Sequence, residues 1–118
     1  MSATVTLREL TSIDVAKELT MTARIFTGTE AKAYGIVSHL SEDPFADSMR
    51  LALEIAARSP DSVAATKQLY QETWVAPEGD ALLLETELQR KLLGTWNMGV
   101  SAAKGLGVPL VPGYRNRQ

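Results

Sequence analysis

The sequence contains no cysteine and a single histidine among its 118 residues. The lack of cysteine excludes disulfides, zinc–cysteine sites and thiol chemistry, and it agrees with a reducing compartment. One imidazole excludes any site that needs two, so we expect no metal site, and we expect His39 on a strand surface rather than as a general base. No segment approaches the roughly 20 unbroken apolar residues of a membrane span, and no export or transit signal is visible. We therefore expect a cytoplasmic protein that does not bind membranes.

Acidic side chains are missing from the end of the chain. The net charge is −2, which argues against a nucleic-acid binder, but no acid follows Glu87. Five basic side chains do follow it, namely Arg90, Lys91, Lys104, Arg115 and Arg117. We favour a helix end that complements its dipole plus a solvated basic tail, and a phosphate-binding role stays open as the alternative.

Apolar spacing and capping residues predict a mainly α protein with one or two short strands. The expected helix starts are Ser12, Thr29, Asp43 with Pro44, Ser59 with Pro60, Pro77 and Asn97. Gly35 and Gly94 are expected to end helices. In the helix that begins at Pro44, the apolar face formed by Phe45, Met49 and Leu53 should be buried. After Lys104, glycines and prolines predict an extended tail.

Residues 36–40 predict a short strand, because Ile36 and Val37 are β-branched and the run is too short for a helix. A lone strand cannot satisfy its ladder hydrogen bonds, and the sequence offers no obvious partner. Either this segment is a loop, or its sheet belongs to another polypeptide.

No set of residues in the sequence indicates a catalytic centre. No G-x-S-x-G motif surrounds any serine. The carboxylates of Glu85 and Glu87 lie two positions apart on a predicted helix, so they point about 200° apart and do not form a catalytic pair. Trp74 and Trp96 should pack in a core or an interface. We therefore assign no catalytic residue to this chain.

Residues 19–37 read LTMTARIFTGTEAKAYGIV and resemble the stretch L-x-L-T-G-R-x-x-x-A-x-E-A-x-x-x-G-L-V of enoyl-CoA hydratases and isomerases. Ala23 and Gly28 stand where the family usually has glycine and alanine. Residues 1–7, 58–69 and 85–92 also resemble family segments, so the resemblance spans nearly the whole chain. The frequent E-G-x-x-A-F-x-E-K-R pattern is not found, and residues 100–107 stand in its place.

The resemblance implies the C-terminal helical portion of a crotonase-like (ClpP/crotonase) α/β fold. Residues 1–40 would end the crotonase core, and residues 41–118 would form the helical trimerisation and CoA-covering region. The family's oxyanion hole and proton-transferring acids would lie upstream of the segment that begins at Met1. Phe26, Trp96 and Lys104 are the residues expected to line a CoA or acyl pocket.

Two functional hypotheses follow from the resemblance. The first is a fragment of an enoyl-CoA hydratase/isomerase (a lyase) of fatty acid metabolism. It would be catalytically incomplete alone, need no cofactor, take an acyl-CoA thioester as substrate, pair with the missing N-terminal half and form a trimer or hexamer. Hydratase, isomerase, thioesterase and dehalogenase chemistry all stay open within it. The second is a free-standing, non-enzymatic helical interaction module derived from the same family.

Overall fold

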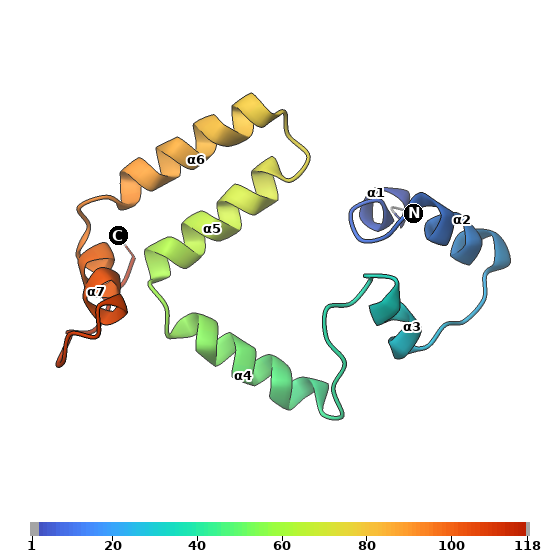
Figure 1. The fold of residues 1–118 in the computed structure, drawn as a ribbon, viewed down its shortest axis with the longest axis horizontal. Helices are drawn as coiled ribbons and strands as arrows, with labels where there is room; N and C mark the ends of the chain where they lie inside the picture. Colours follow the sequence, from blue (N-terminus) through green and yellow to red (C-terminus); the bar gives the residue numbers. More distant parts are fainter. Residues whose placement is uncertain (1–2, 118) are drawn as a thin grey trace. The chain divides into compact units, whose positions relative to one another are not determined.

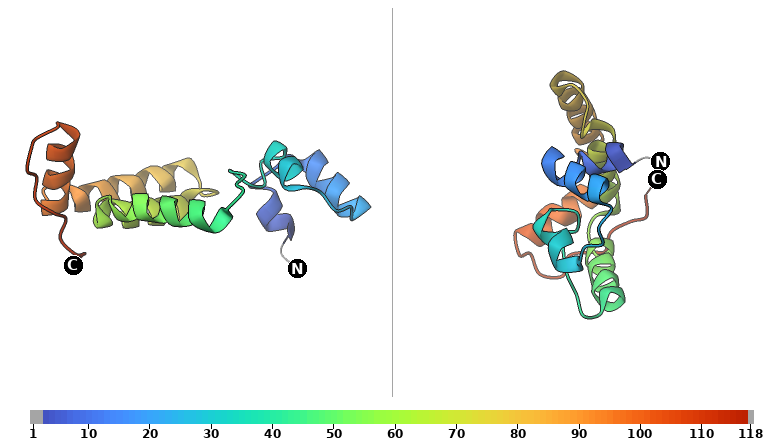
Figure 2. Two further views of the ribbon diagram at one scale, coloured as in Figure 1. Left: turned by 90° about the horizontal axis from the view of Figure 1, so that it is seen from below. Right: turned by 90° about the vertical axis from the view of Figure 1, so that its right-hand side faces the viewer.

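The computed structural model describes residues 3–117 and folds them into seven α-helices (Figure 1). They are α1 (Ala3–Leu7), α2 (Ile13–Thr22), α3 (Gly28–Ala33), α4 (Pro44–Ala56), α5 (Pro60–Thr73), α6 (Glu78–Leu92) and α7 (Trp96–Gly105). Two further views show the same helices (Figure 2). The mainly α fold class is thus confirmed. Within residues 3–117, no helix is both long and apolar enough to cross a membrane.

The chain divides into two compact units, one ending at Ser48 and the other beginning at Met49. We call them the N-terminal unit and the C-terminal unit. The boundary falls inside α4. The division predicted at residue 40 was a functional one, between the end of the core and a region that forms the trimer and covers the CoA site. That division stays a prediction.

In the N-terminal unit, α2 ends where Ala23 adopts a left-handed conformation, with φ 48°, and donates its backbone N–H to the carbonyl of Leu19. A left-handed residue at a helix end is usually glycine, because a Cβ is unfavourable there. The family's glycine at this position therefore has a physical reason, and Ala23 occupies the same backbone conformation at a steric cost.

The start of α3 differs from the prediction. Thr27, not Thr29, caps this helix: its hydroxyl accepts a hydrogen bond from the Glu30 N–H, and the Glu30 carboxylate accepts one from the Thr27 N–H at 2.8 Å. This reciprocal pair is a capping box, and it satisfies two backbone donors that a helix start leaves free. Gly35 follows α3 with φ 76°, as expected.

The strand predicted at residues 36–40 does not form, and the segment is a loop. Backbone N–H groups of Ile36 and Val37 donate to the carbonyl of Ala31, so they close the end of α3 instead of joining a ladder. No strand exists among residues 3–117 to pair with the segment. His39 is exposed, as expected, but it lies in this loop.

In the C-terminal unit, α5 and α6 lie side by side, and α7 packs against α5 (Figure 1). Ser59 caps α5 through its side chain, which accepts the Ser62 N–H, and Pro60 takes the first helical position, as predicted. The last helix begins one residue earlier than predicted, because Thr95 is its cap and accepts the Met98 N–H. Beyond α7, residues 106–117 form a largely irregular tail.

Few apolar side chains are buried. Leu19, Ala31, Leu88 and Val100 are the buried hydrophobic residues of the described chain. The prediction that the apolar face of α4 is buried is wrong for this chain alone: Phe45 is 78% exposed, and Met49 and Leu53 are exposed as well. Trp74 and Trp96 are also exposed rather than packed in a core. Helical periodicity identifies an apolar face, but no residue from 3 to 117 covers it.

Candidate functional site

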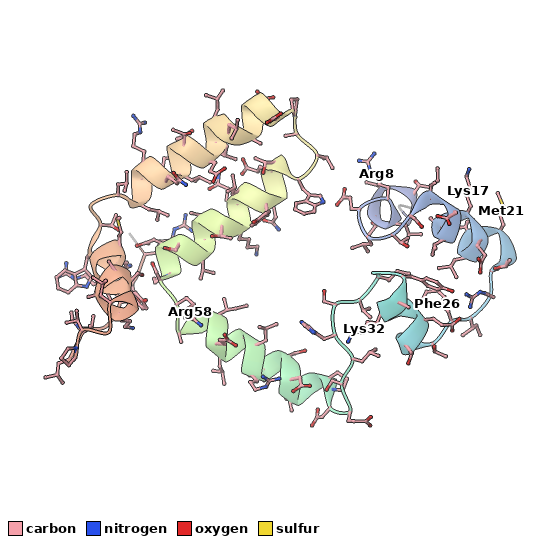
Figure 3. All side chains as sticks on the ribbon, viewed as in Figure 1. Arg8, Lys17, Met21, Phe26, Lys32 and Arg58 are labelled. Carbon is pink, nitrogen blue, oxygen red and sulfur yellow. The ribbon has the colours of Figure 1, made fainter. Side chains whose placement is uncertain are left out.

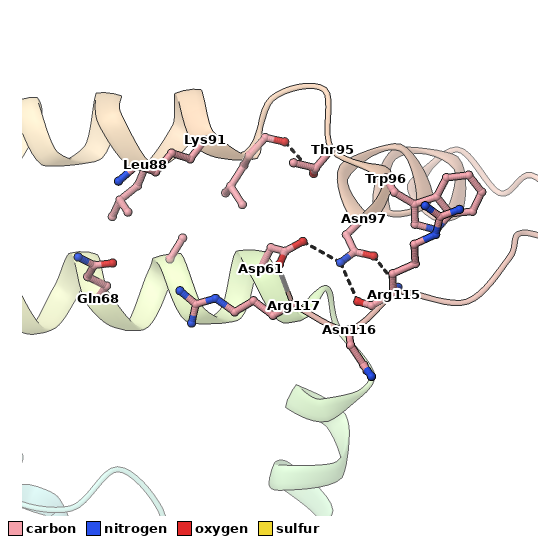
Figure 4. Close-up of a pocket in the computed structure, with 12 residues that line it drawn as sticks. Asp61, Gln68, Leu88, Lys91, Thr95, Trp96, Asn97, Arg115, Asn116 and Arg117 are labelled. Atoms are coloured by element: carbon pink, nitrogen blue, oxygen red, sulfur yellow. Dashed lines mark hydrogen bonds between the residues drawn. The ribbon is translucent and has the colours of Figure 1, made fainter.

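A cleft of about 500 Å³ lies in the C-terminal unit between α5, α6, α7 and the tail (Figure 4). Its walls combine apolar, amide and charged groups. Among its lining residues are Asp61, Gln68, Leu88, Lys91, Trp96, Asn97, Arg115 and Arg117. The tail therefore forms one side of the cleft and supplies two of its cationic residues.

One side chain, Asn97, fixes the tail in this position. Its amide group donates to Asp61 Oδ2 at 2.7 Å and to the carbonyl of Arg115 at 3.0 Å. Its Oδ1 atom accepts the backbone N–H of Arg115 at 2.8 Å. Because Asn97 is only 3% exposed, these bonds replace all of the water that the amide would otherwise bind. We call this arrangement of Asn97, Asp61 and Arg115 the tail clasp.

Aromatic contacts hold the tail along α7 as well. The Arg115 guanidinium lies 4.1 Å from the ring centroid of Trp96, and the Lys104 ammonium lies 4.1 Å from that of Tyr114. Both distances suit cation–π attraction. In addition, Trp96 Nε1 donates to the carbonyl of Gly113 at 3.3 Å. The segment from Gly113 to Arg115 is therefore held at several independent points.

The three predicted pocket residues fall in different places. Trp96 and Lys104 both lie on α7 and both contact the tail, and Trp96 also lines the cleft. Phe26 belongs to the N-terminal unit, in the segment between α2 and α3, and is 36% exposed (Figure 3). The cleft does not include Lys104 or Phe26. Their role at a CoA or acyl pocket stays a prediction.

Sequence reasoning missed the tail clasp. The sequence predicts Asn97 only as a helix start, and it does not single out Asp61. The partners of Asn97 lie 36 residues before it and 18 residues after it. No local pattern in a single sequence signals such a pairing. The nearest signal is Asn97 itself, because a polar side chain on an apolar helix needs hydrogen-bond partners if it is buried.

Charged groups in both units form local ion pairs and hydrogen bonds. Arg24 donates to Glu30 at 2.9 Å and to the Tyr34 hydroxyl at 2.8 Å. The Thr27 N–H, and then Arg24, lower the pKa of Glu30 by hydrogen bonding to its charged form. In the C-terminal unit, Lys91 lies 2.6 Å from Glu87 and lowers the pKa of that carboxylate. These interactions stabilise helix ends and faces rather than form a reaction centre.

The side chains of the cleft offer cations, amide donors and an aromatic face. Such groups bind and orient ligands. No group of three or more histidine, aspartate or glutamate side chains that could hold a metal ion occurs in the part of the chain that the structure describes.

Comparisons with known proteins point to one family. No protein-family model matches the sequence. Enoyl-CoA hydratase EchA19 of Mycobacterium tuberculosis is 32% identical over 80 residues, which are 66% of this chain and 30% of that protein. The crystal structure of an enoyl-CoA hydratase from Polaromonas sp. JS666 matches with a TM-score of 0.83 and 24% identity, over 97% of this chain and 45% of that chain.

This chain thus spans less than half the length of either relative. Both the sequence similarity and the fold agree with the resemblance carried by residues 19–37. The chain is therefore similar, in sequence and in fold, to the C-terminal helical part of a crotonase-superfamily enoyl-CoA hydratase.

Proposed function

We propose that this chain works as the C-terminal helical part of an enoyl-CoA hydratase/isomerase-type enzyme that acts on an acyl-CoA thioester. In this role it contributes oligomerisation surface and part of the acyl-CoA pocket. Backbone N–H groups that polarise the thioester carbonyl, and the acids that move protons, come from the other part of such an enzyme. The likeness to two enoyl-CoA hydratases supports the proposal.

The observation that carries the proposal is the uncovered apolar surface. Side chains that a self-sufficient core would bury are exposed, among them Phe45 at 78%, Leu53 at 66% and Val5 at 53%. Burying a large apolar side chain contributes roughly 1.5–3 kcal/mol. Four buried hydrophobic residues are too few to offset the conformational entropy of more than a hundred ordered residues. A protein surface outside residues 3–117 is needed to cover these faces.

Reconstitution tests the proposal. The chain is mixed with the remaining part of an enoyl-CoA hydratase, supplied as a separate polypeptide, and hydration of crotonyl-CoA is followed. We expect turnover from the mixture and none from either part alone. Hydration by the isolated 118-residue chain would show that the catalytic groups lie within it, and would refute the proposed division of labour.

A matched pair of variants examines the apolar face of α4. Phe45→Asp places a charge where we expect contact with the other part, so it should abolish reconstitution while leaving the helical circular dichroism unchanged. Ser48→Asp adds the same charge at an exposed polar position of the same helix. Equal loss of activity in both variants would mean that the face of Phe45 has no special role.

The alternative, a non-enzymatic interaction module, is supported by the same exposed surface. Mass measurement in solution separates the two. A stable, monodisperse monomer of 118 residues that never complements a hydratase part would favour the module.

A further inference from the structure

Two aromatic side chains are exposed near the turn that joins α5 to α6 (Figure 1). Tyr70 and Trp74 lie four residues apart at the end of α5, so they share one face of that helix. Their exposed fractions are 57% and 63%, and Val75 beside them is 67% exposed. We call Tyr70, Trp74 and Val75 the aromatic patch. Exposed apolar groups that gather in this way mark an interaction surface.

The two rings of the aromatic patch contact each other. Their centroids are 5.9 Å apart, and their planes are inclined by 57°. A tilted pair at this distance is mutually attractive, so each ring restrains the other before any partner arrives. Restrained side chains lose less entropy on binding. Tryptophan and tyrosine are also the residues that contribute most to protein interfaces when they are truncated one by one.

The charge of this part of the hairpin has one sign. Residues 68–89 contain five acidic side chains and no basic one. Those nearest in sequence to the patch are Glu72, Glu78 and Asp80, and none of them forms an ion pair within residues 3–117. The patch therefore lies in a negative field, which attracts cationic partners.

An aromatic pair in a negative field matches the chemistry of a guanidinium, which stacks on rings and donates to carboxylates. The chain itself contains such a stack, since the Arg115 guanidinium lies 4.1 Å from the ring centroid of Trp96. We propose that the aromatic patch binds an arginine-bearing segment of another protein, and that Val75 receives an apolar side chain next to the arginine. The proposal does not depend on the proposed enzymatic function.

A second copy of this chain is a poorer partner for the patch, because many of its cations are already engaged. The basic side chains with ion pairs or cation–π contacts inside the chain are Arg24, Arg58, Lys91, Lys104 and Arg115. Moving such a cation to another molecule replaces one contact by another, so the net gain is small. A segment whose arginines are solvated has no such contact to lose.

Fluorescence anisotropy of a labelled peptide rich in arginine and leucine measures binding to the full 118-residue chain. Peptides of the same length with lysine or glutamate in place of arginine are the comparisons. We expect the arginine peptide to bind several-fold more tightly than the lysine peptide, and the glutamate peptide not to bind. Added salt should weaken binding, because it screens exposed charges. No binding of the arginine peptide, or equal binding of the arginine and lysine peptides, overturns the proposal.

Truncation of the rings tests the patch itself. We expect Trp74→Ala to raise the dissociation constant of the arginine peptide about tenfold, and Tyr70→Ala about threefold, because each removes a ring face. Leu106→Ala removes an exposed apolar side chain from the tail and should change the constant less than about twofold. Circular dichroism shows that each variant keeps its helices. Equal effects of Trp74→Ala and Leu106→Ala would contradict a specific site.

Substitutions of charge test the field. Glu78→Gln should raise the dissociation constant about twofold, whereas Glu42→Gln, an exposed acid of the N-terminal unit, should leave it unchanged. Lys67 lies three residues before Tyr70 on α5 and shares its face, so Lys67→Gln should lower the constant about twofold. Weaker binding by Lys67→Gln would refute the electrostatic part of the argument.

Two further outcomes would show a different occupant and overturn the proposal. If sedimentation velocity shows that Trp74→Ala changes the oligomeric state of the chain, a second copy covers the patch. If Trp74→Ala abolishes reconstitution with the remaining part of a hydratase, as we expect of Phe45→Asp, that part covers the patch. Failure of reconstitution by the unaltered chain leaves the peptide assay unaffected, so the two proposals fail separately.

Discussion

Replacing Asn97 by alanine removes the centre of the tail clasp. The substitution deletes the donor to Asp61 and both hydrogen bonds to the backbone of Arg115. It creates only a small cavity, because an asparagine side chain exceeds that of alanine by a single amide group. The main effect of the substitution is therefore the loss of three hydrogen bonds, whose partners are Asp61 and the backbone of Arg115.

The magnitude follows from the three bonds. A neutral hydrogen bond contributes about 1 kcal/mol and one to a charged group about 1.5–3 kcal/mol, so two neutral bonds and one charged bond give an upper value near 5 kcal/mol for the set. Water replaces part of this, since Asp61 is only partly buried and Arg115 is exposed. We therefore expect Asn97→Ala to lower the free energy of unfolding of the C-terminal unit by about 2 kcal/mol.

Urea unfolding followed by tryptophan fluorescence measures this loss. Release of the tail also removes the Arg115 guanidinium from the face of Trp96, so the native fluorescence should change before any unfolding. Trypsin should cleave at Arg115 faster in the variant than in the unaltered chain, because a held backbone resists proteolysis.

Asn116→Ala is the matched control, because the Asn116 side chain makes no hydrogen bond within residues 3–117. It lies in the same cleft and loses the same amide group. If Asn97→Ala costs no more than Asn116→Ala, the hydrogen bonds of the clasp do not hold the tail, and the reasoning is refuted.

Three further perturbations concern backbone and pH. Gly35 and Gly94 both have positive φ, but a Cβ at Gly35 would lie 2.7 Å from the backbone oxygen of Leu10, whereas one at Gly94 would meet nothing within 4 Å. Gly94→Ala should therefore lower the free energy of unfolding by about 1 kcal/mol, and Gly35→Ala should lower it clearly more. Thermal unfolding of the two variants measures the difference. Ala23→Gly should relieve the φ of 48° and stabilise α2 by about 0.5 kcal/mol in the same assay, and a loss of stability would contradict this. Folding lowers the pKa of Glu30, because its charged form accepts the Thr27 N–H. The carboxylate's contribution to the stability of the folded state is therefore complete above the unfolded pKa near 4.5, and it is lost as the pH falls through the folded pKa. Acid titration of helicity should therefore show α3 weakening below that pH, and Glu30→Gln should remove the dependence.

Helix starts were the most predictable part of the fold, because their determinants are local. Ser59 followed by Pro60, and Asp43 followed by Pro44, each place a hydroxyl or carboxylate acceptor next to a residue that fits the first helical position. The structure contains both caps. Such signals need no information from distant residues, so one sequence suffices to read them.

The error at α3 was also local, and the sequence contained the information to avoid it. Thr27 and Glu30 have the spacing of a capping box, S/T-x-x-E, which competes with Thr29 as a start. The reciprocal bonds of the box satisfy two backbone donors, whereas Thr29 would satisfy one. Counting satisfied donors for each candidate would have selected Thr27.

The remaining differences have one physical origin, since each concerns a partner distant in sequence. The apolar face of α4 was identified correctly, yet periodicity states only that a face avoids water and not which surface covers it. The segment at residues 36–40 has strand-forming residues, but the described part of the chain contains no strand to pair with it. Asn97 is buried by partners at positions 61 and 115, which no local pattern connects.

The exposed face of α4 and the unpaired segment at residues 36–40 point to the same conclusion. An apolar helix face that no part of residues 3–117 covers is useful only against another surface. Phe45 at 78% exposure is the sharpest case, since an aromatic side chain contributes most when it is buried. The tail clasp, in contrast, is satisfied entirely within the C-terminal unit. Polar groups at the cleft of α5, α6 and α7 are therefore satisfied within residues 3–117, whereas the apolar surface that begins at α4 is left uncovered there.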